Sequence, residues 1–210
     1  MSLLVLQGAV EQGFIYALVA LGLYISFRTL DIADLTTDGT FTLGAAVSAV
    51  FTVQGQPLLG VVLAFFCGAL AGFVTALLQT KLGVQPILAG IITMTALYSV
   101  NLMVMGKPNI NFFKEKTIFT AAEAMPGGFG SLLQAAAITA VLCVLLVLFL
   151  RTQLGLSLRA TGDNRDMVSA SSINPAFTTT VGLCLSNAVV ALSGALIAQY
   201  QKFADNTLGT

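Results

Sequence analysis

The feature that most constrains the fold of this chain is a series of long apolar runs separated by short polar segments. A helix needs about 20 apolar residues to cross the hydrocarbon core of a bilayer, and most of the runs approach or exceed that length. The runs are continuous and do not alternate with polar residues, which disfavours a transmembrane barrel. We therefore predict an all-α fold, a polytopic transmembrane helical bundle with about six spans. The predicted spans lie at residues 3–27, 41–53 with an upstream extension, 58–79, 87–105, 134–150 and 177–198.

The composition agrees with a membrane protein and disfavours several other classes. Hydrophobic residues make up 57% of the 210 residues and charged residues 9%, whereas a soluble domain carries about a quarter charged residues. Nine basic and nine acidic residues cancel, so no nucleic-acid partner is expected. The chain has no histidine, and its three cysteines are isolated within apolar runs. We therefore expect no metal site, no cofactor and no enzymatic activity.

The second apolar run is too short to cross a membrane by itself. Its apolar part, Phe41 to Val53, would form about 20 Å of helix against about 30 Å of hydrocarbon. The crossing must begin upstream, which draws Thr37, Asp38 and Gly39 into the membrane as a broken span. Non-helical backbone at that depth is typical of transporters where it borders the solute path, so these three residues are candidates for the path. A solvated cytoplasmic turn is the alternative; it stays open for Asp38.

The same alternative is preferred for two other acidic residues of this region, Asp31 and Asp34, which we expect in a solvated turn. Two further polar residues lie inside apolar runs. Glu11 would cost about 2.5 to 3.5 kcal/mol at the bilayer centre, so it should lie near an interface or on a face turned away from lipid. Asn101 is expected to form an interhelical hydrogen bond, with solute contact as the alternative. Both are kept as candidates for the translocation path.

The longest charge-bearing segment between two strongly apolar runs is Gly155 to Pro175. It contains Arg159 and Arg165, and basic loops of this length tend to stay in the cytoplasm. Asp163 or Asn164 can cap a short helix within it, and the proline prevents that helix from continuing. We predict a short cytoplasmic helix there that serves as a docking surface.

The polar segment Gly106 to Gly130 would then lie on the opposite side of the membrane. Its charges, two prolines and Gly-Gly pair indicate an exposed loop. Its phenylalanines are expected at a membrane interface: Phe112, Phe113, Phe119 and Phe129.

Two stretches carry a family resemblance: GAVEQGFIYALVALGLYISFRTLDIADLTTDGTFTLGAAVSA near the start and GLSLRATGDNRDMVSASSINP between the last two runs. Together they resemble the permease subunits of bacterial ABC importers of the branched-chain amino acid and ribose type. In that family the second stretch is a cytoplasmic segment that contacts the ATPase, and Asp163 would begin its short helix. By resemblance the other ATPase-coupling residues are Gly155, Arg159, Ala160, Gly162, Asn164, Ala170, Ile173 and Asn174.

The resemblance implies a permease subunit of an ATP-driven importer for a small polar solute, such as an amino acid, in the cell (inner) membrane. Its implied partners are a separate ABC ATPase, an extracytoplasmic solute-binding protein, an identical or different second permease subunit, and the lipid bilayer. The chain is also similar to a less characterised subgroup linked to aromatic amino acids. The acidic turn DIADLTTDG departs from the turn usual in branched-chain permeases, which argues against a leucine-type solute.

The resemblance covers essentially all 210 residues, so residues 1–210 are expected to form one transmembrane permease domain. Members of the family usually continue through at least two further spans, which this chain is expected to lack. The alternative is an ion-coupled secondary transporter that uses Glu11 and Asp38. Such carriers usually contain an internal repeat, and the DLTTDG turn occurs once.

Overall fold

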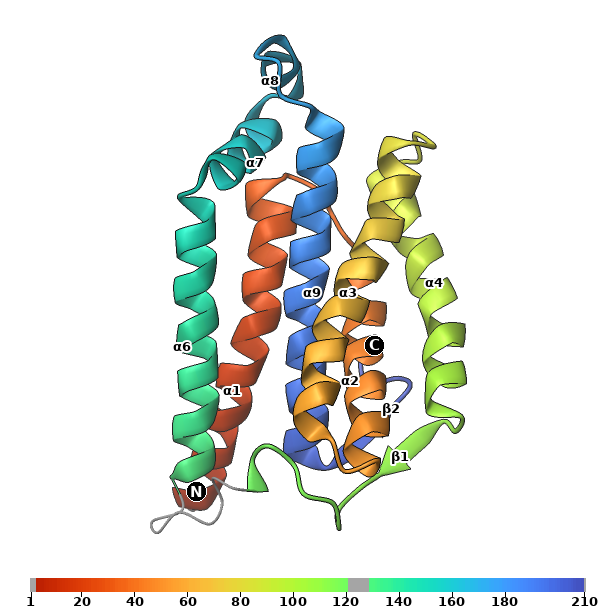
Figure 1. Cartoon of the computed structure of the whole chain (residues 1–210), viewed down its shortest axis with the longest axis vertical. Coiled ribbons are helices and arrows are strands. Elements are labelled where there is room, and N and C mark those ends of the chain that lie inside the picture. Colours follow the sequence, from red (N-terminus) through yellow and green to blue (C-terminus); the bar gives the residue numbers. More distant parts are fainter. Residues whose placement is uncertain (1–2, 121–128, 210) are drawn as a thin grey trace.

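A computed structural model describes residues 3–120 and 129–209 of the chain as a helical bundle with one small two-stranded sheet (Figure 1). Helix α1 (Leu3–Leu23) continues into the π-helix η1 (Tyr24–Thr29). The other helices are α2 (Thr36–Val53), α3 (Pro57–Thr80), α4 (Pro86–Met105), α6 (Gly130–Leu150), α7 (Gln153–Asp163), α8 (Arg165–Ala170) and α9 (Pro175–Gln201). The strands are β1 (Asn109–Asn111) and β2 (Phe203–Asp205).

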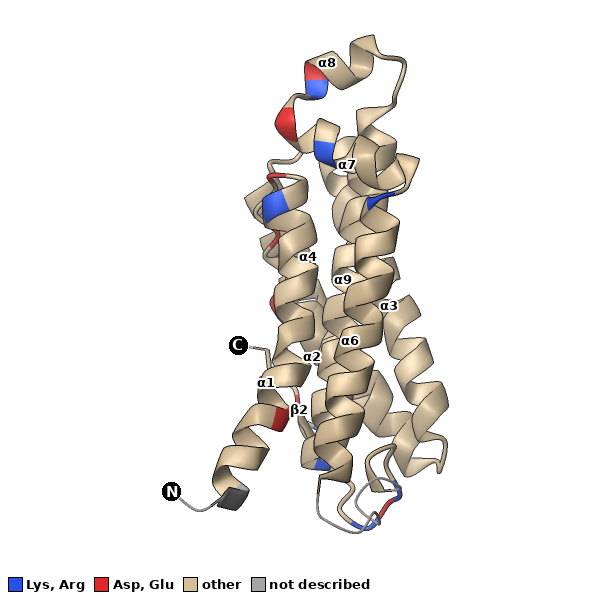
Figure 2. Cartoon of the chain, turned by 90° about the vertical axis from the view of Figure 1, so that its left-hand side faces the viewer, with Lys and Arg blue, Asp and Glu red and all other residues tan. Residues whose placement is uncertain are grey.

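Five helices of the described part are long and apolar enough to cross a membrane. They are α1 with η1, α3, α4, α6 and α9. Helix α2 has 18 residues, about 27 Å of helix, and lies among the others with most of its side chains buried. Charged residues gather toward the two ends of the bundle and leave its middle largely uncharged (Figure 2). The predicted helical membrane bundle is confirmed, with α2 as its short, polar member.

Helix α9 is the centre of the bundle and packs against α1, α2 and α3. Glycines allow the closest approach. A Cβ atom on Gly44 of α2 would collide with the main chain of Ala191, and one on Gly194 of α9 would collide with the carbonyl of Phe41. Gly68 and Gly72 bring α3 equally close to α9. In lipid there is no hydrophobic driving force between helices, and the close van der Waals packing that such small residues allow stabilises the contact instead.

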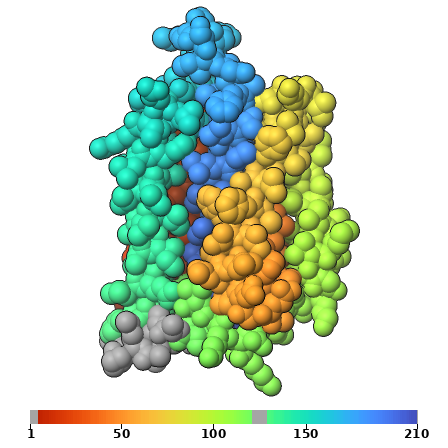
Figure 3. Space-filling model, viewed as in Figure 1, coloured from red at the N-terminus to blue at the C-terminus, as the bar shows by residue number. Residues whose placement is uncertain are grey.

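The outer helices turn apolar side chains outward. On α6 these include Leu133, Val141, Val144 and Leu148, all more than half exposed, as befits a face in contact with lipid. Figure 3 shows a furrow between α6 and α3, with α9 and α1 on its floor.

A non-helical connector, Leu30 to Leu35, joins η1 to α2. Leu30 and Ile32 are buried in a cluster with Ala76, Leu158 and Leu183, so these residues of the connector are packed inside the protein. The predicted break at the second span is therefore present, but its position needs a correction. Thr37, Asp38 and Gly39 lie in the first helical turns of α2, and the irregular backbone ends just before them.

The polar segment between α6 and α9 contains two helices where one was predicted. Thr152 caps α7 by accepting a hydrogen bond from the Gly155 main-chain nitrogen at 3.4 Å. Asp163 is the last residue of α7 and caps nothing. Asn164 caps α8, with its Oδ1 accepting from Met167 N at 3.0 Å. The missed helix α7 is amphipathic, and its Leu158 is completely buried because it packs against the connector and α9.

The segment after α4 forms β1, which pairs antiparallel with β2 after α9, so that Ile110 faces Ala204 across the ladder. This sheet lies at the end of the bundle opposite α8 (Figure 1). Phe112 and Phe119 are 3% and 1% exposed, so the expectation that they lie at a membrane interface is wrong. Phe113 and Phe129 are exposed as expected.

Candidate functional site

Two irregular segments approach the first turns of α2 from opposite ends of the bundle. The Leu30–Leu35 connector arrives from the end that carries α7 and α8. After β2 the chain folds back into the bundle, where the Gly209 nitrogen donates a hydrogen bond to Thr42 Oγ1 at 3.1 Å. A Cβ atom on Gly209 would collide with the carbonyl oxygen of Asp38, so only glycine lets the two main chains lie this close. In Figure 1 this end of the described chain lies at mid-height of the bundle.

A buried hydrogen-bond network fixes the start of α2 to α9. Asn187, near the midpoint of α9, donates from Nδ2 to Asp34 Oδ2 at 2.6 Å. Its Oδ1 accepts from Thr40 Oγ1 at 2.6 Å. The other carboxylate oxygen of Asp34 accepts from Thr36 N at 2.9 Å, and the Thr36 hydroxyl reaches Thr75 of α3 at 2.9 Å. The network therefore joins α2, α3 and α9 at mid-depth.

Asp34 is 1% exposed, so the expectation of a solvated turn is wrong for this residue, while Asp31 is exposed as expected. The charged oxygens of Asp34 are satisfied by protein donors, as a buried carboxylate requires. Sequence reasoning also missed Asn187 and Gln199, which is fully buried and bonded to Ser48 and Pro57. The available signal was the one used for Asn101, an amide side chain inside an apolar run.

Asp38 differs from Asp34 in having no side-chain partner. Its side chain is exposed, and no side chain of the described residues donates a hydrogen bond to its carboxylate. It lines a cavity of about 150 Å³ between α1, α2 and the segment after β2. A charged group at this depth must face water or protein, because exposure to lipid costs about 2.5 to 3.5 kcal/mol. The cavity is lined by Tyr16, Val19, Leu23, Thr37, Asp38, Phe41, Leu208 and Gly209.

Gly39 and Asn101 lie together on the other side of α2, where it meets α4. The Nδ2 group of Asn101 donates to the Gly39 carbonyl at 3.2 Å, and Asn101 is 1% exposed. The predicted interhelical hydrogen bond is confirmed. Neither residue lines the Asp38 cavity, so the structure does not bring these two candidates together with Thr37 and Asp38.

Glu11 holds three helices together. Its carboxylate accepts hydrogen bonds from Gln7 of α1 at 3.0 Å, Ser131 of α6 at 2.7 Å and Tyr200 of α9 at 2.7 Å, and the side chain is 4% exposed. Glu11 thus lies on a face turned away from lipid, which was one of the two positions expected for it. It does not line the Asp38 cavity. Its contacts describe a structural clamp.

The residues assigned to ATPase coupling all lie in α7, α8 or the turns that flank α8, at the end of the bundle opposite the sheet (Figure 1). Some of them shape this region. A Cβ on Gly155 would collide with Leu150, and one on Gly162 would collide with the carbonyl of Thr29 at the end of η1. Asn174 caps α9, accepting from Ala176 N at 3.0 Å. Ile173 is half-buried.

The other coupling residues face outward. Arg159, Ala160, Asp163 and Ala170 are exposed, and Arg159 and Asp163 line a polar recess of about 200 Å³ with Arg28. Met167, which the resemblance did not single out, is 69% exposed on α8. Beneath them the hydroxyls of Thr161 in α7 and Thr178 in α9 lie 2.8 Å apart in the interior. The outward-facing residues of α7 thus belong to a helix whose opposite face is packed against the bundle.

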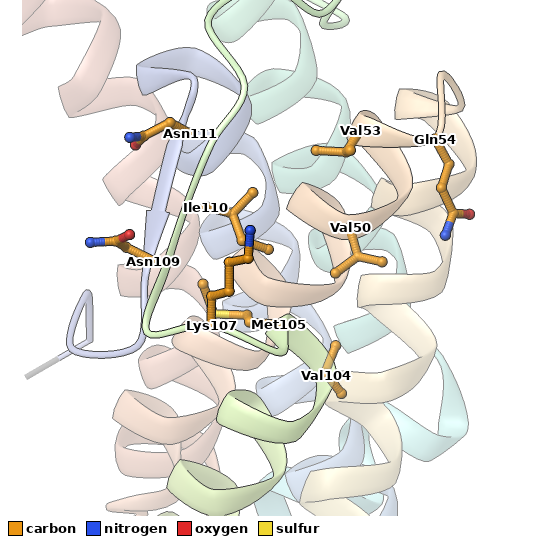
Figure 4. A pocket seen from close by; sticks show the side chains of 9 residues that line it. All are labelled: Val50, Val53, Gln54, Val104, Met105, Lys107, Asn109, Ile110 and Asn111. Atoms are coloured by element: carbon orange, nitrogen blue, oxygen red, sulfur yellow. The ribbon is translucent and has the colours of Figure 1, made fainter.

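A cavity of about 600 Å³ lies at the opposite end between α2, α4 and β1 (Figure 4). In the figure Lys107 extends beside Ile110, while Asn109 and Asn111 point away from α2. These polar side chains are exposed, and none of the predicted site residues lines the recess. We do not assign it a chemical role.

Nothing in the described part of the chain is arranged as a metal centre, because no three His, Cys, Asp or Glu side chains cluster there. Cys67, Cys143 and Cys184 are free thiols.

Comparison of the sequence with known proteins shows which family the chain belongs to. The chain is 38% identical over 199 residues to the "Tyrosine transport system permease protein" of Clostridioides difficile (strain R20291), an alignment that covers 94% of the chain and 65% of that relative. It is 35% identical over 205 residues to an uncharacterised protein of Rickettsia prowazekii (strain Madrid E), with 98% of the chain and 71% of the relative covered.

The chain thus spans about 65% of the length of the tyrosine transport permease. No solved structure matches it. The family described as "Branched-chain amino acid transport system / permease component" matches residues 5–209. Five helices of the described residues are long and apolar enough to cross a membrane, and the family match runs along nearly the whole chain, so the chain is a multi-pass membrane protein that belongs to the family of branched-chain amino acid transport system permease components.

Proposed function

We propose that this chain forms the membrane-spanning permease subunit of an ATP-driven importer for an amino acid in the cell (inner) membrane. Family membership supports a transport role, and the relative named as a tyrosine transport permease supports an aromatic amino acid as solute. The proposed partners are a separate ABC ATPase, an extracytoplasmic solute-binding protein and a second permease subunit.

One observation carries the proposal: α7 is packed against the end of η1 and the first half of the connector that leads to α2. Gly162 rests on the Thr29 carbonyl at the end of η1, and Leu158 packs with Leu30 and Ile32. A displacement of α7 would therefore move the connector. The connector contains Asp34 and ends at Leu35, immediately before the first turn of α2, which carries Asp38. A displacement of α8 could thus be transmitted through α7 and the connector to the Asp38 cavity.

Helix α8 is suited to receive such a force from a protein partner. It is exposed on most of its surface, with Val168 alone buried, and Met167 projects from it. Methionine adapts its shape to an apolar groove, and a short helix laid in a groove is a common recognition mode. The predicted ATPase-coupling residues Arg159, Asp163 and Ala170 are exposed around it.

The cavity beside Asp38 is too small for a complete solute site. Ligand pockets usually measure about 300 to 1,000 Å³, against about 150 Å³ here. Protein beyond the described residues must therefore supply the remaining wall. A second permease subunit facing Asp38 would enclose the site and keep its carboxylate away from lipid.

Co-purification with the candidate ATPase tests this proposal. Met167→Asp and Ala170→Trp should release the ATPase while leaving the thermal stability of the permease unchanged, because both side chains are exposed. Phe113→Asp is the matched control, since Phe113 is 65% exposed at the opposite end of the bundle. Failure of the unaltered chain to capture an ATPase, or equal capture by all variants, would contradict the coupling role of α8.

A further inference from the structure

We propose that the Asp38 cavity recognises a zwitterionic aromatic amino acid, with the Asp38 carboxylate accepting hydrogen bonds from the solute ammonium and the Tyr16 ring stacking on the solute ring. The inference rests on the proposed transport function and assigns the chemistry of its solute site. Both residues line the same cavity, although they come from different helices.

The proposed contact between Asp38 and the solute ammonium rests on the contrast between Asp34 and Asp38. The two carboxylates lie four residues apart in sequence, Asp34 in the connector and Asp38 in the first turn of α2. Asp34 is 1% exposed and is held by Thr36 N and Asn187 Nδ2, so it has no capacity for a solute charge. Asp38 is exposed to the cavity and receives no hydrogen bond from any side chain within residues 3–120 and 129–209. A carboxylate kept unpartnered at this depth is complementary to a cation that arrives from outside the chain.

An ammonium group fits that requirement better than a metal ion does. Among the described residues no second carboxylate lines the cavity, and the other polar group of the lining side chains, apart from the Tyr16 hydroxyl, is the hydroxyl of Thr37. Ca²⁺ and Mg²⁺ take about six or more oxygen ligands, which this lining does not offer. A primary ammonium needs only a few acceptors, and its hydrogen bonds to a carboxylate are charge-assisted.

The proposed stacking of the solute ring on Tyr16 rests on a pair of stacked rings in the protein. Tyr16 and Phe41 lie with their ring centroids 6.0 Å apart and their planes inclined by 15°. Phe41 is 4% exposed and is held against Gly194, whereas Tyr16 is 46% exposed. The buried Phe41 ring therefore supports the Tyr16 ring, and the exposed side of Tyr16 remains available to the ring of the solute. Offset stacking of aromatic rings adds about 0.5 to 1.5 kcal/mol beyond the area buried, and in the fold-change measured below this equals roughly twofold to twelvefold.

The placement of the two residues matches the shape of the solute. Asp38 and Phe41 are three positions apart on α2 and so share one helix face. The ring that Phe41 supports and the carboxylate therefore border one cavity, as the ring and ammonium group of one amino acid would require. The described residues of the cavity include no basic side chain, so the solute carboxylate must be bound by the wall that lies beyond them.

Binding to the purified full-length permease in lipid nanodiscs tests the inference, without the solute-binding protein, whose own selectivity would interfere. Four probes separate the groups: L-tyrosine; tyramine, which keeps the ammonium and the ring; 3-(4-hydroxyphenyl)propionate, which lacks the ammonium; and L-leucine, which lacks the ring. Saturation-transfer NMR or calorimetry reports the affinities. Asp38→Asn is compared with Asp31→Asn, which removes the same charge from an exposed residue outside the cavity.

We expect L-tyrosine and tyramine to bind, and the deaminated acid and L-leucine to bind at least about tenfold more weakly. Asp38→Asn should weaken L-tyrosine binding by about tenfold or more, and Asp31→Asn should not change it. Tyr16→Leu should weaken L-tyrosine binding by about twofold to twelvefold and leave L-leucine binding unchanged. Equal binding of the deaminated acid, or an unchanged affinity in Asp38→Asn, would overturn the inference.

Those outcomes are separable from failure of the proposed function. A permease that captures its ATPase but binds L-tyrosine independently of Asp38 would refute the solute site alone. A permease that binds L-tyrosine through Asp38 but captures no ATPase would refute the ATP-driven mechanism and leave the solute site standing.

Discussion

Replacing Asn187 with leucine tests the buried network that fixes the start of α2. The substitution keeps the approximate volume of the side chain but removes the 2.6 Å hydrogen bond to Asp34 Oδ2 and the acceptor used by Thr40. Thr40 loses little, because its hydroxyl also bonds the Thr36 carbonyl at 2.7 Å. The cost therefore falls mainly on the Asp34 carboxylate, which keeps one donor among the described residues, the main-chain nitrogen of Thr36.

The expected magnitude follows from the charge and burial of that carboxylate. Interhelical hydrogen bonds in membrane proteins average about 0.6 kcal/mol. Bonds to charged groups contribute about 1.5 to 3 kcal/mol, and Asp34 is 1% exposed. We expect Asn187→Leu to lower the free energy of unfolding by about 2 to 3 kcal/mol. In an Asp34→Asn background the same change should cost only about 0.5 to 1 kcal/mol, since no buried charge is then left behind.

Reversible unfolding in mixed detergent micelles, followed by circular dichroism, measures both values. Asn109→Leu is the matched control, because Asn109 is exposed on β1 and its replacement should change stability by less than about 0.5 kcal/mol. The reasoning is refuted if Asn187→Leu unfolds like the unaltered protein, or if its cost is the same with and without the Asp34 carboxylate.

Three further results are expected. Gly44→Ala forces α2 away from the Ala191 main chain and should cost about 1 to 3 kcal/mol in the same unfolding assay, whereas Gly13→Ala, which meets no atom within 4 Å, should cost nothing measurable. Glu11→Leu should cost about 1 to 3 kcal/mol because donors from three helices lose their acceptor, and Glu11→Gln should cost less; equal costs would show that the clamp does not depend on the carboxylate. Gly162→Val should separate α7 from the Thr29 carbonyl, so that the ATPase is still captured but solute uptake falls by an order of magnitude; normal uptake would exclude α7 as the route of coupling.

The gross architecture could be predicted because hydrophobic length alone determines where helices cross a bilayer. The shortness of the Phe41–Val53 run also located the irregular second span, since a helix of that length cannot reach across the hydrocarbon. The position of the break could not be predicted as well. The helix starts at Thr36, where the Asp34 carboxylate accepts a hydrogen bond from the Thr36 main-chain nitrogen and Asn187 holds that carboxylate in place, and Asn187 is about 150 residues away in sequence.

The candidate site shows the same division between local and distant information. Asp38 could be singled out from sequence because a carboxylate beside a short apolar run is costly in lipid. Its separation from Glu11 and Asn101 could not, because those residues take partners from other helices. Helix α7 was missed because its apolar residues are few and its stability comes from packing Leu158 against the connector. Local sequence does not record that contact.

The central claim is that ATP hydrolysis by a separate subunit drives this permease, and uptake into proteoliposomes tests it most directly. The assembled transporter, with ATP enclosed on the ATPase side and solute-binding protein on the other, should accumulate labelled L-tyrosine. Accumulation should stop when a non-hydrolysable analogue replaces ATP and should continue when ionophores collapse proton and sodium gradients. Uptake that follows an imposed ion gradient without the ATPase would contradict the account and identify the chain as an ion-coupled carrier.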